Sequence, residues 1–456
     1  MEATLPYNSI RAARPDGSLT PSHRPIEDGP PVAVAMKDAA RAAPADATRY
    51  PPVAIFDNYW APTLAFARSL GRRRVPLHFY GPGAGRWSRY CSRHEDCPPV
   101  EDIARFVPWL RQRVLSGAIT RIAPTTDLIT YYVSLLRDEF PESVRGSIAP
   151  LEEVERCLIK TRFASACDDY RIPCPPTRTP SSLEEAEAHA RELGFPCIIK
   201  PNSHLVVGTT ERGRLIRDAG ELRTHFRHYE IADGRQVLAE RYPGLLLPVV
   251  QRYVPSARRC VYSVSGFKDR ERGIVASSLS YKCEQWPPDV GTSVVQVSCS
   301  DERISRIGLR MVDALITRGI FELELLADGE HLLPIDLNPR AFGFIELDIA
   351  LGRDLPWLWF RSTLGEPAEE TPPMPERALE ARHRLLYSLR RLAGPRSARS
   401  ASDVDWRARD RPRASISMLG HWSDPVPMWI GYAHQLRHPR SLIRSQFQYT
   451  ARPPVA

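Results

Sequence analysis

Four polar side chains recur at every second position in two neighbouring segments of the sequence. Residues 332–344, LLPIDLNPRAFGF, begin like a buried strand, but Asp336 and Asn338 project from its opposite face. In the preceding segment, Glu322 and Glu324 likewise share one face of a strand. If the two strands pair through a tight turn, these groups come within reach of one ion. Carboxylate and amide oxygens, without Cys or His, suit Mg²⁺ better than zinc.

Arg340 follows Asn338 by two residues, and its planar guanidinium group can bind a phosphate through two parallel hydrogen bonds. Magnesium in sites of this type usually bridges phosphate oxygens. The segment therefore predicts a place for metal and phosphate together. A hairpin with a solvated acidic face is the alternative that the spacing alone leaves open.

The chain contains 57 arginines but five lysines, so each lysine is a candidate for a task that needs a compact charge. Lys200 ends the apolar segment 195–201, where a strand would expose its ammonium group. Lys160 lies in a predicted helix before that segment, and Lys282 closes another predicted strand. We interpret these three as ligands of nucleotide phosphate, although each alone would equally fit a surface lysine. Lys268 is expected at a turn, with no motif around it.

Two patterns of secondary structure are predicted to position these residues. The first part of the chain alternates apolar strands with helical segments, at 51–57, 61–73, 75–81, 101–116, 118–127 and 128–139. Strand, helix and strand within about 30 residues indicate a parallel βαβ unit. This part therefore predicts a small doubly wound α/β domain at 50–150.

Beyond residue 150 the pattern becomes α+β, with a helix at 181–194 that has a serine start and a glycine stop. Strands are predicted at 195–201, 236–242, 247–254, 258–267, 273–282 and 292–299, and as a pair around a turn at 328–329. We expect a domain at 151–365, made of subdomains at about 160–255 and 256–365. Residues 1–49 are predicted to be a flexible tail. Residues 366–456 form an Arg- and Pro-rich extension that we expect to pack against the preceding domain.

Composition argues against several classes of protein. The sequence contains no run of about 18 apolar residues, so we expect no membrane span. Its polar start does not resemble a signal peptide. Nine cysteines without a repeating spacing favour reduced thiols in the cytoplasm. The net charge of +8 is spread along the chain among 54 acidic residues, so we expect neither a nucleic acid nor a membrane as partner.

The order of these motifs resembles the ATP-grasp superfamily. The segment GFPCIIKP is similar to its strand with a phosphate-binding lysine, and LPVVQRYVP to its hinge beside adenine. Residues 319–340 resemble its metal-binding strand pair, which ends in an acidic-x-Asn-x-Arg signature. TLAFARSLGRRRVPLHFY and IAPTTD resemble the preceding domain of carboxylate–amine ligases and carbamoyl-phosphate-synthase-like members. Over about residues 51–365, the resemblance implies a small doubly wound N-terminal domain followed by an ATP-grasp fold of two α+β subdomains.

By position, the resemblance implies which residues bind the nucleotide. Lys160 and Lys200 would contact the phosphates of ATP. Gln251, Tyr253 and Val254 would line the adenine pocket, chiefly through the backbone of the hinge.

The resemblance also implies the metal-binding and catalytic residues. Glu324, Asp336 and Asn338 would hold one or two Mg²⁺, with Mn²⁺ as an alternative metal and Glu322 as an alternative to Glu324. Arg340 would stabilise the transferred phosphoryl group or the acyl phosphate. Lys282 would face phosphate and substrate.

Two features depart from the family pattern. The glycine-rich flap after the second lysine is thin here, because residues 202–214 contain Gly208 and Gly213 only. Polar residues that would substitute for its phosphate contacts are Thr209, Thr210, Arg212 and Arg214. Asp336 stands where the family usually has glutamate.

The resemblance implies an ADP-forming ligase that activates a carboxylate as an acyl phosphate and joins it to an amine or a similar nucleophile. Its partners would be ATP and two small molecules, and a homodimer is one possible state. The alternatives are phosphorylation of bicarbonate or carbamate, as in carbamoyl phosphate synthesis, and a nucleotide-binding protein without turnover, which the thin flap would favour.

Overall fold

A computed structural model describes most of the chain from residue 49 onward. The described ranges are 49–56, 60–208, 213–258, 261–286, 291–367, 371–372, 374–375, 378–393, 412 and 414–437. The chain divides into the units Met1–Ala47 and Thr48–Ala456, and all described residues belong to the second. The predicted tail at 1–49 lies outside the described residues apart from Arg49. No helix within the described ranges is long and apolar enough to cross a membrane.

A small parallel sheet begins the described chain, with its strands in the order β1-β2-β3. They are β1 Val53–Phe56, β2 Leu77–Tyr80 and β3 Arg93–Glu95. All of β1 is buried, as expected for a strand covered on both faces. Helix α1 Trp60–Arg72 connects β1 to β2 and completes the predicted βαβ unit.

The strand predicted at 118–127 is reduced to a single bridge between Ala54 and Ile122. The chain then turns directly into the next helix, because the side chain of Thr126 accepts a hydrogen bond from the backbone N–H of Ile129. The helices around this bridge are α2 Ile103–Leu115 and α3 Asp127–Leu135. The first residue of α3 therefore lies just beyond the end of the bridged segment.

The helix predicted near residue 151 consists of two helices that meet at an extended residue. α5 Leu151–Leu158 and α6 Lys160–Asp169 are separated by Ile159, with φ −113° and ψ 112°. The backbone N–H of Lys160 donates to the carbonyl oxygen of Asn202 over 2.8 Å. Helix α6 therefore starts beside the segment that follows the Lys200 strand.

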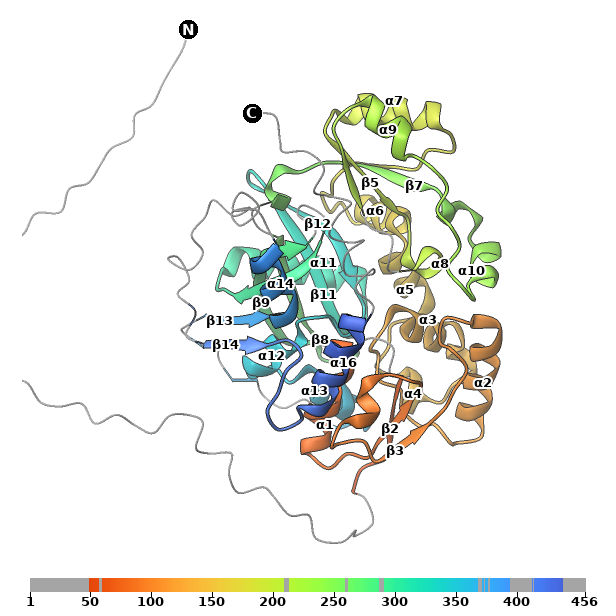
Figure 1. Ribbon diagram of the computed structural model, residues 1–456, viewed down its shortest axis with the longest axis vertical. Helices are drawn as coiled ribbons and strands as arrows, with labels where there is room; N and C mark the ends of the chain where they lie inside the picture. Colours follow the sequence, from red (N-terminus) through yellow and green to blue (C-terminus); the bar gives the residue numbers. More distant parts are fainter. Residues whose placement is uncertain are drawn as a thin grey trace, which may run out of the picture. The chain divides into compact units, whose positions relative to one another are not determined.

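The second sheet has four antiparallel strands in the order β4-β7-β5-β6. They are β4 Thr177–Arg178, β5 Cys197–Pro201, β6 Arg214–Ile216 and β7 Pro248–Arg252. Helices α7 Leu183–Leu193 and α9 Ala219–His225 share a core with Cys197, Ile199 and Val250, and so cover one face of this sheet (Figure 1). Helix α7 starts at Ser182 and stops at Gly194, as its sequence predicted.

One predicted strand is wrong, because residues 236–242 contain the helix α10 Gln236–Arg241. Leu, Ala, Glu and Arg are good helix formers. Leu238 and Ala239 are adjacent and both buried, whereas neighbouring residues of a strand face opposite sides.

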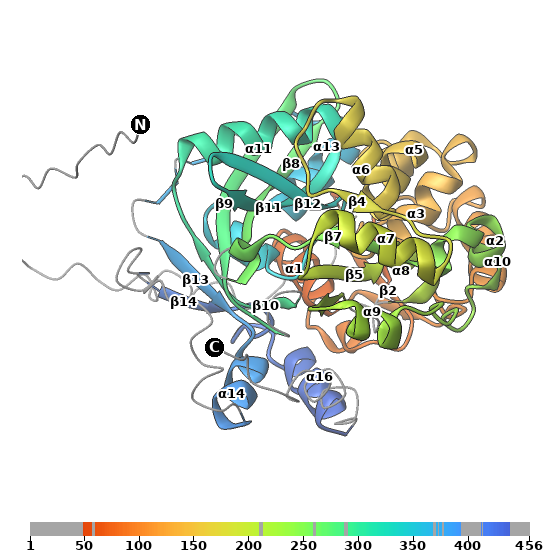
Figure 2. The same cartoon turned by 90° about the horizontal axis from the view of Figure 1, so that it is seen from above.

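The third sheet has seven strands in the order β12-β11-β8-β9-β10-β13-β14. Its strands are β8 Val261–Asp269, β9 Gly273–Trp286, β10 Thr292–Ser298, β11 Gly319–Asp328, β12 His331–Asn338, β13 Leu379–Arg382 and β14 Ala414–Ser417. Helix α11 Glu302–Leu315 crosses β8, β9 and β11 on one face, as Figure 2 shows. Leu323 and Leu337 face α11, and alternation sends Glu322 and Asp336 to the opposite face.

Segments from both ends of the described chain pack around this large sheet. The helices here are α12 Ile345–Ala350, α13 Leu355–Thr363, α14 Arg384–Ala393 and α16 Val426–Arg437. Phe66 of α1 meets Trp359 of α13 with ring centroids 5.4 Å apart, so the N-terminal region shares a core with the large sheet's helices. Strand β13 pairs with β10, so the extension after residue 366 contributes strands to the sheet. The predicted fold class, α/β followed by α+β, is confirmed, while the domain boundaries at 150 and 365 stay a prediction.

Candidate active site

The paired strands β11 and β12 form the centre of the candidate site. In their antiparallel register, Glu324 lies opposite Asp336 and Glu322 lies opposite Asn338. Directly opposed residues of an antiparallel pair have their side chains on the same face about 5 Å apart. The apolar residues between them pack toward α11. Local alternation is thus enough to gather three carboxylates and one amide on one small area.

Two lysines from other elements contact these carboxylates. The Nζ atom of Lys160, the first residue of α6, lies 2.5 Å from Oδ1 of Asp336. The Nζ atom of Lys282 on β9 lies 2.6 Å from Oε1 of Glu324. Both lysine side chains are nearly buried, at 13% and 9% exposure. Two of the predicted phosphate-facing lysines therefore meet the predicted metal strands.

Burial and neighbouring charges oppose each other at these ion pairs. Burial favours the neutral form of Asp336, but the charge and hydrogen bond of Lys160 outweigh it and lower the pKa of this carboxyl group. Burial likewise disfavours the charged form of Lys282, but Glu324 and Glu322 raise its pKa. Asp336 and Lys282 are consequently both charged at neutral pH.

Lys200 on β5 has a different electrostatic environment. Burial, followed by the nearby charge of Lys160, lowers its pKa to about 8, and Asp336 and Glu324 oppose this only in part. The ammonium groups of Lys200 and Lys160 thus repel each other, and the nearby carboxylates offset this repulsion only in part. An anion of several negative charges, such as a nucleotide phosphate chain, would complete the balance.

Glu322 is the most buried carboxyl group of the cluster, at 2% exposure. It accepts hydrogen bonds from Ser263 Oγ at 2.9 Å and from Asn338 Nδ2 at 2.7 Å. Burial, together with the repulsion from Glu324, raises its pKa to about 8. Glu322 therefore orients Asn338, while Glu324 is the glutamate that lies directly opposite Asp336.

Arg340 lies where β12 ends, and its guanidinium group has protein partners on each nitrogen. Nε donates to Oδ1 of Asp127, Nη1 to the carbonyl oxygen of Ala341 at 2.7 Å, and Nη2 to Oδ1 of Asn338 at 3.1 Å. The predicted catalytic arginine is thus next to the strand pair and in a fixed orientation. Sequence reasoning missed Asp127, although its place at the end of a predicted strand of a parallel sheet was an available signal.

The three predicted adenine-site residues lie where the second sheet leads into the third. Gln251 on β7 donates from Nε2 to Thr177 Oγ1 at 2.7 Å. Val254 is 2% exposed and, with Tyr253 alongside, packs in an apolar cluster that includes Leu326 and Leu333. The Val254 side chain therefore belongs to a core, which leaves the backbone as its means of contacting adenine. The adenine assignment stays a prediction.

Lys268 corrects one expectation. It lies in β8 and not at a turn, it is 7% exposed, and its Nζ donates to the carbonyl oxygens of Asp313 and Ile316 at 3.0 and 2.8 Å. These carbonyls end α11, where the backbone lacks partners of its own and a cation is favourable. Lys268 is therefore a structural cap. Its thin stem and compact charge explain why arginine does not stand there.

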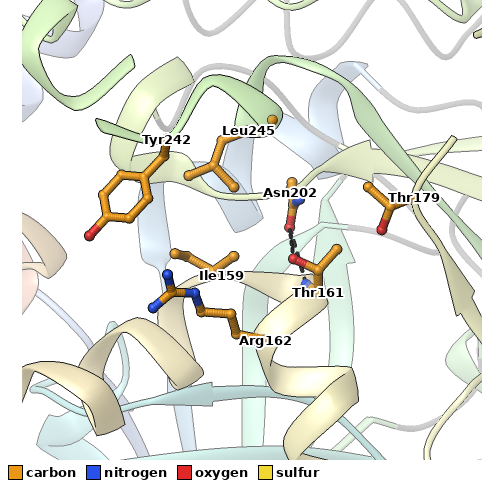
Figure 3. Close-up of a pocket in the computed structure, with 8 residues that line it drawn as sticks. Ile159, Thr161, Arg162, Thr179, Asn202, Tyr242 and Leu245 are labelled. Atoms are coloured by element: carbon orange, nitrogen blue, oxygen red, sulfur yellow. Dashed lines mark hydrogen bonds between the residues drawn. The ribbon is translucent and has the colours of Figure 1, made fainter. Parts of the chain in front are cut away.

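Asn202 joins the two lysine-bearing elements. Its Oδ1 accepts hydrogen bonds from the backbone N–H and the Oγ1 of Thr161, at 3.1 and 3.2 Å. Figure 3 shows these bonds at the edge of a pocket of about 290 Å³. Its lining residues are Ile159, Thr161, Arg162, Thr179, Asn202, Tyr242, Gly244 and Leu245. Neither Lys160 nor Lys200 lines this pocket, so it is separate from the predicted phosphate-binding lysines.

Two predicted loops are only partly described. Of the thin flap, Gly208 with φ 76° and Arg214 on β6 are described, while Thr209, Thr210 and Arg212 lie outside the described residues. The loop after Lys282 also lies outside them at 287–290.

The side-chain oxygens on β11 and β12 suit a magnesium ion that also binds a phosphate. Among the described residues, no three of His, Cys, Asp and Glu come together as a metal-binding group. Glu324, Asp336 and Asn338 supply two carboxylates and an amide, and hard oxygen ligands suit Mg²⁺. Magnesium bound to nucleotides commonly takes one or two carboxylates and completes its shell with water and phosphate oxygens. The site therefore fits a metal that is bound jointly with a phosphate, and not a closed protein cage.

Comparison with known proteins shows which sequences and folds the chain resembles. No protein-family profile matches the chain. It is 28% identical over 220 residues to the formate-dependent phosphoribosylglycinamide formyltransferase of Rhodococcus jostii, which covers 46% of the chain and 51% of that protein. The chain thus spans about half the length of this relative.

Solved structures extend the likeness over more of the chain. The L-amino acid ligase from Bacillus licheniformis superposes with a TM-score of 0.55 and 16% identity, over 72% of this chain and 79% of that one. A biotin carboxylase domain from Hydrogenobacter thermophilus, solved with magnesium, ADP and bicarbonate, gives 0.55 and 13%, over 72% and 73%. The chain has the ATP-grasp fold. The lysine predicted to be the second phosphate ligand lies on β5, and the strands predicted to bind metal are β11 and β12.

Proposed function

We propose that this ATP-grasp protein is an ADP-forming ligase that activates a carboxylate as an acyl phosphate and transfers the acyl group to an amine or a similar nucleophile. The observation that carries the proposal is the convergence of Lys160, Lys200 and Lys282 on the acidic strand pair. Several fixed positive charges facing a carboxylate pair suit the transfer of a phosphoryl group between anionic oxygens.

The residues act mainly through position and charge. Lys160 and Lys200 bind the phosphates of ATP and balance charge as the terminal phosphoryl group leaves. Arg340 faces the acyl phosphate, and Lys282 holds the substrate side of the site. Glu322 keeps Asn338 in orientation through its hydrogen bond. Because acyl phosphate formation needs aligned reactants and charge balance, no covalent protein nucleophile is required.

Magnesium, or manganese in its place, would be held by Glu324, Asp336 and Asn338 and would neutralise phosphate charge when bound with ATP. Before nucleotide binds, Lys160 and Lys282 neutralise the same two carboxylates. The ion pairs therefore keep the acidic strand pair stable in the absence of metal.

The names of similar proteins support this class of reaction. The Rhodococcus relative is a formate-dependent formyltransferase, and the Bacillus structure is an amino acid ligase. The Hydrogenobacter domain was solved with bicarbonate, so phosphorylation of bicarbonate or carbamate is the second candidate. We further propose small-molecule substrates and a cytoplasmic location, in keeping with the irregular spacing of the nine cysteines. A homodimer is also compatible with the dimer named for the Hydrogenobacter domain.

The test is ADP release across pairs of carboxylates and amines, with bicarbonate included and with Mg²⁺ present or chelated. Hydroxylamine in parallel reactions traps an acyl phosphate as a hydroxamate. We expect Mg²⁺-dependent ADP release with one carboxylate, a hydroxamate of that acid, and an amide when the amine is added. Lys200→Ala should abolish these products, whereas Arg303→Ala at an exposed ion pair with Glu330 should not.

Other outcomes distinguish the alternatives. ADP release with bicarbonate as the only acid would favour carbamoyl-phosphate-type chemistry. Saturable ATP binding without ADP release from any pair would overturn the ligase proposal in favour of a nucleotide-binding protein.

A further inference from the structure

The contact between Arg340 and Asp127 joins the site to the N-terminal sheet. The two residues lie 213 positions apart in the chain, and their side chains are 15% and 20% exposed. A second bond runs beside it, from the backbone N–H of Ala341 to the carbonyl oxygen of Pro124 over 2.9 Å. The segment at 124–127 therefore holds the turn after β12 at two points.

The local structure favours a fixed acidic side chain at this position. Asp127 is the first residue of α3, whose N-terminus is capped by Thr126. Backbone N–H groups and the helix dipole both stabilise a negative charge in the first turn. A carboxylate anchored on a helix of 9 residues is also less mobile than one on a loop.

Arg340 needs such an anchor. An arginine side chain has many rotamers, and a charge that moves loses most of its value to a reaction that depends on alignment. Asn338 and Ala341 lie on the same turn as Arg340 and move with it. Asp127 differs because it belongs to another part of the fold.

We propose that Asp127 is a positioning residue, which fixes the guanidinium group of Arg340 and makes the end of the N-terminal sheet part of the active site. This inference rests on the proposed function, in which Arg340 faces the acyl phosphate. Asp127 itself touches no reacting group and acts through Arg340. The pairing also balances part of the arginine's charge while no substrate anion is bound.

Asp127→Asn is the informative variant, because it keeps the size of the side chain and removes its charge. We expect kcat to fall between about 10- and 100-fold, the effect of a misplaced stabilising group, while KM for ATP stays within about twofold. Asp127→Glu restores the charge and should recover part of kcat. In an Arg340→Lys background, Asp127→Asn should cause little further loss, since both changes remove the same function.

A second measurement reads the contact without catalysis. Hydrogen exchange of the peptide that contains Ala341 should be faster in Asp127→Asn than in the unmodified protein. The matched control is Asp354→Asn at the start of α13, where Asp354 is 17% exposed and pairs with Arg73 at 2.8 Å. Asp354→Asn should change neither kcat nor the exchange of the Ala341 peptide.

The outcomes separate this inference from the proposed function. An active protein whose kcat is unchanged by Asp127→Asn, or whose losses add to those of Arg340→Lys, would overturn the positioning role and leave the ligase standing. Unchanged exchange at the Ala341 peptide would overturn it as well. No ADP release from the unmodified protein, together with faster exchange in Asp127→Asn, would overturn the ligase and leave Asp127 as the anchor of Arg340.

Discussion

At the scale of single residues, charge balance explains much of the candidate site. Lys160 and Lys282 each neutralise one carboxylate of the strand pair, while Lys200 lies beside them with its pKa lowered to about 8. Glu322 is buried behind them and orients Asn338. The site therefore pairs two of its lysines with carboxylates, and Lys200 supplies an additional positive charge where the phosphates are proposed to bind.

Changes to β12 should separate metal-dependent turnover from folding. We expect Asp336→Asn and Asn338→Ala to abolish Mg²⁺-dependent ADP release, because the first removes the negative charge of one predicted ligand and the second removes the other ligand's oxygen. Asp336→Asn should still fold, but its thermal unfolding midpoint should be lower, because the nearly buried ammonium group of Lys160 loses its charged partner. ADP release and unfolding are measured on the same preparations. Normal turnover in both variants would remove the metal assignment.

The low pKa of Lys200 predicts how nucleotide binding depends on pH. The folded protein lowers this pKa from 10.5 to about 8, so above pH 8 the neutral amine dominates and attracts phosphate weakly. The affinity of the unliganded protein for ATP should therefore fall up to about tenfold per pH unit above that value.

Lys200→Arg provides the comparison for this pH dependence, because a guanidinium group stays protonated through the same range. Equilibrium titration of ATP from pH 7 to 9.5 measures both proteins. We expect a downward slope in the unmodified protein and a flatter profile in the variant. Parallel slopes would show that another group controls binding.

At the scale of elements, Lys268 shows how one buried cation can complete a helix. Its bonds to the last carbonyls of α11 replace partners that the helix cannot supply. Lys268→Ala would leave these carbonyls unpaired, so we expect the free energy of unfolding to fall by about 1–3 kcal/mol. Turnover measured well below the unfolding midpoint should be retained.

Arg303→Ala is the matched control for Lys268→Ala, because Arg303 lies at the other end of α11 in an exposed pair with Glu330. Exposed pairs contribute about 0.2–1 kcal/mol, so this variant should unfold almost as the unmodified protein does. Denaturant unfolding measures both. Equal stability of the two variants would contradict the capping role.

Period-two alternation allowed the strand pair and the shared face of its four polar residues to be predicted from sequence, because one face had to be apolar against a helix. The helix α10 was missed because a segment of good helix formers with two buried residues is too short to show its period. Lys268 was misplaced for another reason: its partners on α11 are 45 and 48 residues away, and no local pattern records them. The partners Arg340 and Asp127 lie 213 residues apart, so their contact could not be read from a local pattern, although the position of Asp127 at the end of a predicted strand was an available signal.

At the scale of the whole molecule, segments distant in sequence close around the large sheet. Helix α1 packs on α13, and Arg68 of α1 is buried at 1% exposure, where it donates to the carbonyl oxygen of Leu419 at 2.8 Å. Strand β13 pairs with β10 and so extends the large sheet at the edge away from β12. The N-terminal region and the extension after residue 366 thus belong to the same packed body as the metal-binding strands. A site that uses Arg340 and Asp127 together depends on this arrangement.

The net charge of +8 raises the question of whether the protein binds nucleic acid. Many of its arginines are engaged in ion pairs with acidic neighbours, such as Arg178 with Glu192 and Arg217 with Glu221. Within the described part of the chain, such pairing lowers the positive potential that a phosphate backbone would need. We therefore expect the lysine cluster to bind ATP, and we expect the protein to bind nucleic acid only weakly.

Salt dependence distinguishes these two kinds of ligand. A protein that contacts six or more backbone phosphates loses about 10³-fold or more in affinity between 50 and 200 mM salt, because bound counterions are released. ATP held by Mg²⁺ and nearly buried lysines should lose far less, since partly buried charges are weakly screened. Mg·ATP and a DNA or RNA duplex are titrated against one preparation at both salt concentrations. We expect saturable Mg·ATP binding at each and duplex binding that disappears at the higher one. Salt-resistant duplex binding without affinity for Mg·ATP would contradict the ligase proposal and require a nucleic-acid surface on this fold.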